Sequence, residues 1–210
     1  MRAAFTAVYD RAAWTGGSGP GSGEAETAIW RPFLERYLTA NDVQSVLDLG
    51  CGDWQSTRLI NWEGIAYHGI DVVPQVIAAC KQRYEAPPWV TFRCADITSC
   101  PLPAADLVIV KEVLQHWPNA AIAAFRRRLS WRRALIVNDY VPGLGNPDIA
   151  AGGYRPLDLA APPFGWPVAE VCRWTLAYAD GTEETKVVHE LSAASCGRAS
   201  APGTRPGSGG

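Results

Sequence analysis

The chain has 210 residues, of which 48% are hydrophobic and 19% are charged, and its formal net charge is −2. This composition predicts one globular domain with a full core, and the mild acidity gives no overall electrostatic footprint for a nucleic-acid partner. Because no signal peptide, membrane-spanning apolar run, zinc-ligand spacing or Cys-x-x-Cys pair is recognisable, we expect a cytoplasmic protein without a membrane partner, a structural metal or a disulfide framework.

Residues 1–40 are expected to form an N-terminal segment that ends in one helix. The glycine-rich stretch TGGSGPGSG occupies positions 15–23, and Ser22 within it can cap a helix. Apolar residues then recur at helical spacing over residues 29–38, while Pro32 predicts a kink or a restart of that helix.

Short apolar runs alternate with helical patterns through the middle of the chain. The predicted strands are Ser45–Leu49, Ala66–Ile70, Val90–Cys94, Asp106–Val110 and Ala134–Asn138. The predicted helices are Trp54–Ile60, Pro74–Tyr84 and Asn119–Leu129. Strands that alternate with helices predict a parallel sheet in a doubly wound α/β fold.

The last two predicted strands are connected differently. They cover Val171–Tyr178 and Thr185–Leu191 and flank an Asp-Gly turn at 180–181, which predicts an antiparallel hairpin. Beyond Ser192 the chain consists mainly of Gly, Ser, Pro, Ala and Arg, so we expect residues 193–210 to form a disordered tail.

A long segment rich in glycine and proline, residues 142–167, separates the fifth predicted strand from the hairpin. Loops of this length are usually functional or disordered, and the aromatic and charged residues in this one favour a substrate-binding loop. Tyr154 and Arg155 are its candidate substrate-binding residues. The Arg155 guanidinium can hold a carboxylate or phosphate through two hydrogen bonds, or it can form a salt bridge to Asp158 that shapes the loop.

The sharpest motif is VLDLGCGD at 46–53, in which a strand ends in Asp-x-Gly-x-Gly and enters a helix. Its glycines allow a tight turn and the close approach of a ligand at the carboxyl edge of the sheet. Asp53 stands where the dinucleotide-binding fingerprint has its third glycine, which weakens a dinucleotide interpretation. Asp71 ends the second strand and can accept hydrogen bonds from both ribose hydroxyls, and Asp96 after the third strand can accept one from an adenine amino group.

Four stretches carry a family resemblance, namely VLDLGCGD at 46–53, GID at 69–71, AD at 95–96 and ADLVIVKEVLQHW at 105–117. Together they resemble the class I S-adenosylmethionine-dependent methyltransferases. The resemblance covers roughly residues 40–192. It implies a cofactor-binding α/β domain over 41–192, with a doubly wound, mostly parallel seven-stranded sheet and a C-terminal antiparallel hairpin.

The resemblance also implies S-adenosyl-L-methionine as the cofactor. By the family pattern, the residues around it are Asp48, Gly50, Cys51 and Gly52 for the methionine part, Asp71 for the ribose, Val72, Asp96 and Ile97 for the adenine, and Lys111 beside the methyl donor. In this fold the segment before the first strand often forms a lid, so Trp14, Gly16 and Gly17 are expected to lie over the cofactor.

The ends of the fourth and fifth predicted strands supply candidates for the chemistry. His116 suits a general base because the ordinary pKa of histidine is about 6.5, but the same residue can simply begin the next helix and pack under the sheet. Glu112 is a second candidate base. Asp139 lies on the same edge and can orient an amine or hydroxyl acceptor, or cap a loop.

These features favour transfer of a methyl group to an oxygen, nitrogen or sulfur atom of a small-molecule acceptor by in-line displacement. Alignment of the reactants can lower such a barrier by about 7–11 kcal/mol, so the family needs no universal catalytic residue. A protein or peptide methyltransferase and a non-catalytic S-adenosylmethionine-binding protein are the alternatives. RNA methylation is disfavoured because Lys-Glu-Val-Leu at 111–114 replaces the Asn/Asp-Pro-Pro-Tyr/Phe motif. We expect a monomer or a homodimer.

Overall fold

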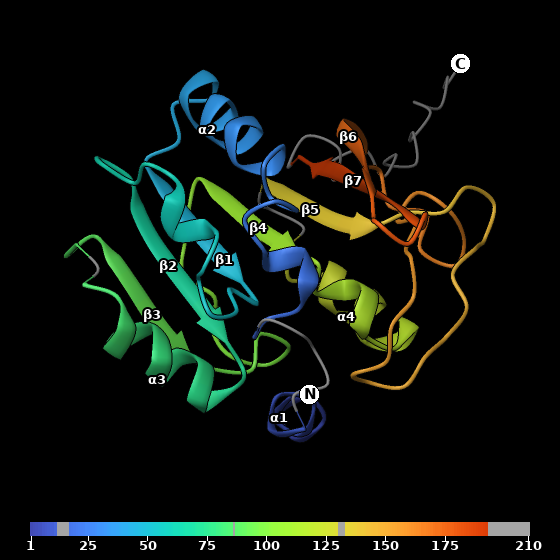
Figure 1. Ribbon diagram of the computed structural model, residues 1–210, viewed down its shortest axis with the longest axis horizontal. Helices are drawn as coiled ribbons and strands as arrows, with labels where there is room; N and C mark the ends of the chain where they lie inside the picture. The colour runs from blue at the N-terminus through green and yellow to red at the C-terminus, as the bar shows by residue number, and fades with distance from the viewer. Residues whose placement is uncertain (12–16, 86, 130–132, 193–210) are drawn as a thin grey trace, which may run out of the picture.

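The computed structural model describes residues 1–11, 17–85, 87–129 and 133–192, and it contains one seven-stranded sheet. The strands are β1 (Ser45–Leu49), β2 (Ala66–Asp71), β3 (Val90–Cys94), β4 (Leu107–Lys111), β5 (Ala134–Asp139), β6 (Ala169–Ala177) and β7 (Glu183–Leu191). Their order in the sheet is β3-β2-β1-β4-β5-β7-β6 (Figure 1). The first five strands are parallel, whereas β7 runs antiparallel to both β5 and β6. The predicted fold class is confirmed.

Helices cover both faces of the sheet. They are α1 (Arg2–Asp10), α2 (Trp30–Ala40), α3 (Pro74–Arg83) and α4 (Asn119–Arg126), with single 3₁₀ turns η1 (Pro20–Ser22), η2 (Thr57–Leu59) and η3 (Leu114–His116). One hydrophobic cluster joins α1 and α4 to the sheet, and a second cluster joins α2 to the other face. Neighbouring strand residues alternate between the clusters, as Val108 and Ile109 do in β4. The strands are therefore buried on both sides, as parallel strands usually are.

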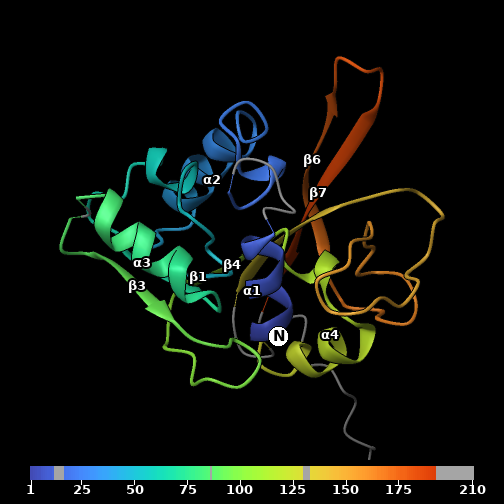
Figure 2. The same cartoon turned by 60° about the horizontal axis from the view of Figure 1, so that its bottom comes forward.

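The hairpin of β6 and β7 extends beyond the layered body (Figure 2). The part of β7 that pairs with β5 is well covered, and Val187 and Val188 are nearly inaccessible to solvent. The register pairs Asp139 of β5 with Lys186 of β7. This pairing brings a charged residue of the antiparallel strand to the carboxyl edge of the parallel strands. No helix of the described residues has the length and apolar character needed to cross a membrane.

The structure corrects the predicted start of the N-terminal helix. Ser22 lies in η1, where its hydroxyl donates to the Ser18 carbonyl over 3.3 Å, and it caps no helix. The helix α2 begins only at Trp30. Pro32 consequently lies in the first turn of α2. Backbone N–H groups in a first turn make no hydrogen bond within the helix, so proline, which lacks an N–H, is tolerated there and α2 continues to Ala40. Arg2–Asp10 form α1, for which the sequence analysis made no prediction.

The predicted helix over Trp54–Ile60 is also corrected, because only η2 forms there. Trp54 has a φ of 60°, in the left-handed region that non-glycine residues rarely adopt. Its indole ring packs against Tyr67 and Phe92, with centroid distances of 5.9 and 5.1 Å. Packing of this aromatic side chain into the core therefore overrides the helical pattern. The predicted tail 193–210 lies outside the described residues.

Candidate functional site

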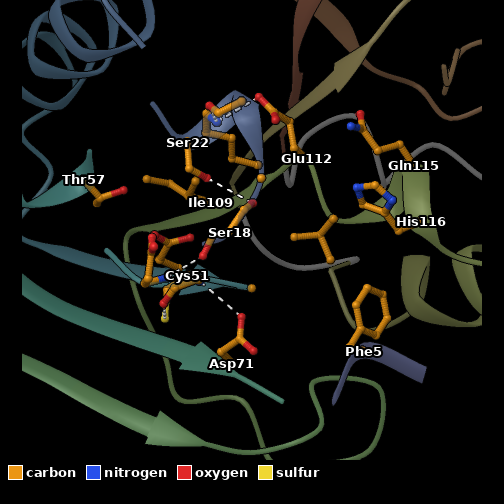
Figure 3. Close-up of a pocket in the computed structure, with 18 of the residues that line it drawn as sticks. Phe5, Ser18, Ser22, Cys51, Thr57, Asp71, Ile109, Glu112, Gln115 and His116 are labelled. Atoms are coloured by element: carbon orange, nitrogen blue, oxygen red, sulfur yellow. Dashed lines mark hydrogen bonds and ion pairs between the residues drawn. The ribbon is translucent and has the colours of Figure 1, made fainter. Parts of the chain in front are cut away.

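A cavity of about 500 Å³ runs along the carboxyl edge of the parallel strands. Most of the predicted site residues line it, namely Asp48, Gly50, Cys51, Gly52, Asp71, Val72, Asp96, Ile97, Lys111, Glu112, His116, Asp139 and Tyr154. Gly17 and Arg155 lie outside the lining, and Trp14 and Gly16 fall outside the described residues. Figure 3 shows Cys51 and Thr57 on the opposite side of this cavity from Gln115 and His116. The topology thus brings the predicted cofactor and catalytic residues into one space.

The loop after β1 needs both of its predicted glycines. Gly50 and Gly52 have φ values of 84° and 57°, which are strained for residues with a side chain. A Cβ at Gly50 would overlap Val113, and a Cβ at Gly52 would overlap Ser18. The bare backbone of this loop therefore forms a cradle against the cavity.

Asp71 ties this loop to the end of β2. One carboxylate oxygen accepts a hydrogen bond from the Gly52 N–H over 3.2 Å, and the other accepts one from the Val73 N–H over 2.9 Å. Burial raises the pKa of Asp71, although these backbone hydrogen bonds oppose the rise. A carboxylate kept buried at the wall of a cavity is typical of a ligand-binding position.

Asp48 lies deeper, at the end of β1. It accepts a hydrogen bond from the Tyr67 hydroxyl over 2.6 Å. Burial raises the pKa of Asp48 to about 6, against the lowering effects of Tyr67 and Lys111. Ionised Asp48 therefore costs folding free energy near neutral pH, which again points to a role in function.

Asp96 marks the far end of the cavity, after β3. One of its oxygens accepts hydrogen bonds from the Thr98 N–H over 2.9 Å and from the Thr98 hydroxyl over 2.6 Å. The other oxygen lies 3.9 Å from the amino group of Met1. Ile97 is buried, and Val72 is half-buried beside it in the same core cluster.

The N-terminal segment crosses this edge of the sheet. The Ser18 hydroxyl oxygen accepts hydrogen bonds from the Asp53 N–H over 2.7 Å and from the Tyr9 hydroxyl over 2.9 Å. The Lys111 ammonium group donates to the Gly21 carbonyl over 2.8 Å. Residues 17–22 therefore connect the loop after β1 to the end of β4 (Figure 3).

A buried lysine organises the other end of the cavity. Lys186 is 2% exposed and contacts three carboxylates. They belong to Asp139, to Glu184 at 2.9 Å and to Glu112 at 3.5 Å. Burial alone would lower the pKa of Lys186, but Glu112 and Asp139 outweigh it and raise the pKa. The ammonium group is therefore charged and holds the three acids together.

Glu112 lies between two lysines at the end of β4. Burial favours a higher pKa for its carboxyl group, but Lys111, at 2.8 Å, and Lys186 outweigh it and lower the pKa. Its backbone φ of 56° is in the left-handed region, which costs about 1–3 kcal/mol for a residue with a side chain. The contacts with Lys111 and Lys186 thus stabilise the ionised carboxylate of Glu112, although the backbone conformation of this residue is unfavourable.

Asp139 is fixed by its neighbours on both oxygens. Gln115 donates its amide N–H to one oxygen over 2.9 Å and accepts the Asp139 backbone N–H over 2.8 Å. The Tyr154 hydroxyl donates to the same oxygen over 2.9 Å, and Lys186 contacts the other. Burial raises the pKa of Asp139 to about 6 although Lys186 opposes the rise. Both oxygens are already engaged, so this arrangement suits orientation better than proton abstraction.

His116 closes η3 and lines the cavity beside Tyr154. Its Nδ1 lies 2.7 Å from the Gly153 carbonyl oxygen. Because a carbonyl only accepts hydrogen bonds, Nδ1 carries the proton and the neutral ring has its lone pair on Nε2. Burial lowers the pKa of His116, against the raising effect of the Gly153 hydrogen bond. The side chain is consequently a neutral proton acceptor near pH 7.

Arg155 has a different place from the one the sequence suggests. It is 3% exposed, and its guanidinium donates to the Asn119 side-chain oxygen over 2.6 Å and to the Gln115 carbonyl over 3.3 Å. The Asp158 carboxylate accepts backbone N–H groups of the loop, from Ala160 over 2.9 Å and from Ala161 over 3.2 Å. The Arg155 guanidinium thus has Asn119 and Gln115 as its hydrogen-bond partners in place of the predicted Asp158, and its role in substrate binding stays a prediction.

The sequence analysis missed Lys186, Glu184 and Gln115. Lys186 lies in the predicted strand Thr185–Leu191, and Glu184 lies just before its predicted start. In β7 the two residues are two positions apart, so they point to the same face of the sheet. The register that places this strand beside β5 then brings Lys186 to Asp139. A pair of charged residues in a strand next to the site was the available signal. Gln115 carried none, because its role depends on the position of Asp139.

Comparisons with known proteins agree with this architecture. A family model described as a methyltransferase domain matches residues 47–132. Acetylserotonin O-methyltransferase of Mus musculus is 33% identical over 147 residues, which are 60% of this chain and 34% of that protein. Trans-aconitate 2-methyltransferase of Methylobacterium nodulans is 38% identical over 79 residues, covering 36% of this chain and 30% of that protein. The chain thus matches only about a third of the length of these curated relatives.

Two solved structures resemble the whole fold. The N-methyltransferase NodS of Bradyrhizobium japonicum has a TM-score of 0.60 and 15% identity, covering 82% of this chain and 99% of its own. The 1,6-didemethyltoxoflavin-N1-methyltransferase of Burkholderia thailandensis has a TM-score of 0.62 and 19% identity, covering 91% of this chain and 87% of its own. At these identities the likeness shows a shared fold alone. The methyltransferase-domain match and the strand order agree, so residues 47–132 belong to a methyltransferase domain with the fold of the class I S-adenosylmethionine-dependent enzymes.

Proposed function

We propose that this chain transfers a methyl group from S-adenosylmethionine to an oxygen, nitrogen or sulfur atom of a small-molecule acceptor. One observation carries the proposal: a single cavity of about 500 Å³ contains both the glycine loop with Asp71 and the group of Glu112, His116 and Asp139. A volume of this size is typical of small-molecule and cofactor sites. Both reactants can therefore meet in one cavity.

The residues at the β1 and β2 end fit the cofactor. When bound, S-adenosylmethionine supplies a methyl group attached to a positively charged sulfur atom. The Asp71 carboxylate would accept hydrogen bonds from the ribose hydroxyls, and Asp96 with Ile97 would hold the adenine. The cradle at Gly50 and Gly52, which a side chain would fill, supports the close approach of the methionine part.

The residues at the β4 and β5 end would prepare the acceptor. His116 would take the proton of an acceptor hydroxyl, amine or thiol on Nε2. Glu112 and Asp139 would orient the acceptor, because both are held in place by Lys186. Alignment of this kind can lower a barrier by about 7–11 kcal/mol, and a positioned base can add a factor of about 10²–10⁴.

Charge at this end favours a neutral or cationic acceptor. The carboxylates of Glu112, Asp139 and Glu184 outnumber the ammonium groups of Lys111 and Lys186 by one. An acceptor with several carboxylates would meet net repulsion in a poorly hydrated space. The site therefore suits a hydroxyl- or amine-bearing acceptor better than a polycarboxylate of the trans-aconitate type.

The N-terminal segment would act as a lid. Phe5 and Tyr9 of α1 line the cavity, and residues 17–22 cross its edge through the Ser18 and Gly21 contacts. Such a cover excludes water while the reaction proceeds. Deletion of residues 16–21 is expected to weaken cofactor binding or turnover while the domain stays folded.

Isothermal calorimetry tests the cofactor assignment. S-adenosylmethionine and S-adenosylhomocysteine should bind, NAD should not compete, and Asp71→Ala should reduce the affinity. Unchanged affinity in Asp71→Ala would show that the ribose assignment is wrong. Retained binding without turnover on any acceptor would favour the non-catalytic alternative.

A screen of a metabolite extract with methyl-labelled S-adenosylmethionine tests the acceptor class. Label should appear in small molecules, whereas label confined to macromolecules would favour the protein or peptide alternative. His116→Ala should lose turnover and keep cofactor binding. His68→Ala is the matched control, because His68 lies on β2 outside the cavity and pairs with Thr91. Equal turnover in the two variants would remove His116 as the base.

A further inference from the structure

The loop between β5 and β6 is fastened to η3 on both sides of His116. The Gly152 N–H donates to the His116 carbonyl over 3.0 Å, and the Arg155 N–H donates to the Gln115 carbonyl over 3.1 Å. Between these two points the Gly153 carbonyl lies 2.7 Å from His116 Nδ1. The position of the Gly153 carbonyl is thus fixed by the residues on either side of it.

The Arg155 side chain strengthens the second of these fastenings. One guanidinium nitrogen donates to the same Gln115 carbonyl over 3.3 Å, and another donates to the Asn119 side-chain oxygen over 2.6 Å at the start of α4. The planar, rigid fork of an arginine can serve both acceptors at once, whereas the single ammonium nitrogen of lysine presents a different geometry. Arg155 therefore connects α4 and η3 to the segment of the β5–β6 loop that contains Gly153.

The Gly153 carbonyl determines which nitrogen of His116 holds the proton. While the Gly153 carbonyl stays in place, Nδ1 must donate to it, and Nε2 keeps the lone pair that a general base needs. If the carbonyl moves away, the neutral ring can carry its proton on either nitrogen. The form with the proton on Nε2 accepts no proton from a substrate at that atom.

We propose that Arg155 is a positioning residue for the reaction, which holds the Gly153 carbonyl against His116 and so fixes the proton on Nδ1. The inference rests on the proposed role of His116 as the base. Arg155 itself does not line the cavity, so its effect on turnover passes through Gly153 and His116. It is also buried among hydrogen-bond partners, which sets it apart from an arginine that binds an anionic substrate.

The test compares Arg155→Lys with the wild type and with Arg173→Lys. Arg173 is the control because it pairs with Glu170 on the exposed β6 strand, away from the site. The first measurement is the ¹⁵N NMR spectrum of the imidazole groups at a pH where His116 is neutral. The chain has three histidines, so a His116→Gln variant assigns the signal. Wild type and Arg173→Lys should show one nitrogen pattern, with the proton on Nδ1, and Arg155→Lys should show a mixture.

The second measurement is turnover as a function of pH. In Arg155→Lys, kcat should fall by about 10-fold or more while the acceptor KM and the affinity for S-adenosylhomocysteine change by less than about twofold. The acid limb of the profile should move to lower pH, because the Gly153 hydrogen bond raises the pKa of His116 and its loss removes that effect. Asn119→Ala, which removes one partner of Arg155, should shift the tautomer in the same direction.

The outcomes separate this inference from the proposed function. An unchanged nitrogen pattern in folded Arg155→Lys overturns the positioning role, even if kcat falls. A changed pattern with unchanged kcat overturns it as well, because the tautomer would then not matter for turnover. If His116→Ala retains wild-type turnover, the proposed base is wrong, and the NMR result still reports on the tautomer by itself.

Discussion

The two ends of the cavity are built in different ways. At the cofactor end, Asp71 is held by backbone N–H groups of Gly52 and Val73, which lie in the loops that follow β1 and β2. At the acceptor end, charged side chains hold one another, and they come from β4, β5 and β7. One end is therefore a property of two local loops, whereas the other exists only when three strands have assembled.

This difference sets how each end responds to substitution. A backbone donor is unaffected by changes in neighbouring side chains, so the cofactor end tolerates variation except at positions such as Gly50 and Gly52, where a side chain does not fit. The acceptor end contains three carboxylates around one buried ammonium group, and removal of that ammonium group leaves the carboxylates without compensation. We expect single changes to affect stability mainly at the acceptor end and ligand binding mainly at the cofactor end.

The largest expected effect is that of Lys186→Met. Three carboxylates would remain close together without their shared cation, and breaking a buried ion pair in this way costs about 3–5 kcal/mol of folding free energy. The loss should be greatest at neutral pH and should shrink as acid protonates these carboxylates. Urea unfolding at pH 7 and pH 5 measures both expectations. Lys81→Met, at an exposed position of α3, is the control, and a loss equal to that of this control would contradict the cooperative network.

Asp48→Asn should act in the opposite direction on stability. Asp48 has a pKa of about 6 in the folded chain, above the ordinary value, so the folded state binds more protons than the unfolded state between about pH 4 and 6. Stability of the wild type therefore falls by up to about 3 kcal/mol as pH rises through this window. The asparagine variant lacks this loss and still accepts the Tyr67 hydrogen bond.

Unfolding measured at pH 4.5 and pH 7 tests this expectation. The difference in unfolding free energy between variant and wild type should grow with pH in favour of the variant, while S-adenosylmethionine binding becomes weaker. A variant that is less stable than the wild type at pH 7 would contradict the view that Asp48 is kept at a cost to folding.

The next effect is on ligand binding at the cofactor end. Asp71→Asn removes the charge that strengthens hydrogen bonds to two ribose hydroxyls, and hydrogen bonds to charged groups contribute about 1.5–3 kcal/mol. Affinity for S-adenosylhomocysteine should fall by about 10- to 100-fold, as measured by calorimetry. The thermal midpoint should fall by less than in Lys186→Met, because the asparagine oxygen can still accept the Val73 N–H and only the hydrogen bond from the Gly52 N–H is lost. If Asp71→Asn instead lost much stability and kept its normal affinity, the expected difference between the two ends of the cavity would be contradicted.

The same contrast explains what the sequence could predict. Strands β1 and β3 have their predicted bounds, because continuous or alternating apolar residues decide burial locally. The predicted residues at the cofactor end were recognisable because they lie at or just after the carboxyl ends of parallel strands, which meet at one edge of the sheet. They are Asp48, Gly50, Gly52, Asp71 and Asp96. For this half of the site, local sequence and parallel topology are sufficient.

The other half depends on register and on packing between distant segments. Lys186 reaches Asp139 only through the antiparallel register of β5 and β7, which a pattern of strands does not specify. The side-chain direction of Arg155 depends on Asn119 and Gln115, which lie 36 and 40 residues away. Trp54 does not begin the predicted helix, because its ring packs in the core against Tyr67 and Phe92. Interactions of this range carry no local periodic signal.

The smallest expected effect is that of Tyr154→Phe, which probes the rim of the acceptor end. Tyr154 is 53% exposed, but its hydroxyl donates to Asp139 over 2.9 Å and lies 3.5 Å from Glu184. Loss of one such hydrogen bond costs about 0.5–1.5 kcal/mol, so the acceptor KM should rise by about 2- to 10-fold. The affinity for S-adenosylhomocysteine should stay unchanged because that ligand would occupy the other end. Parallel steady-state kinetics and calorimetry test this split, and an equal change in both quantities would mean that the two ends of the cavity are not independent.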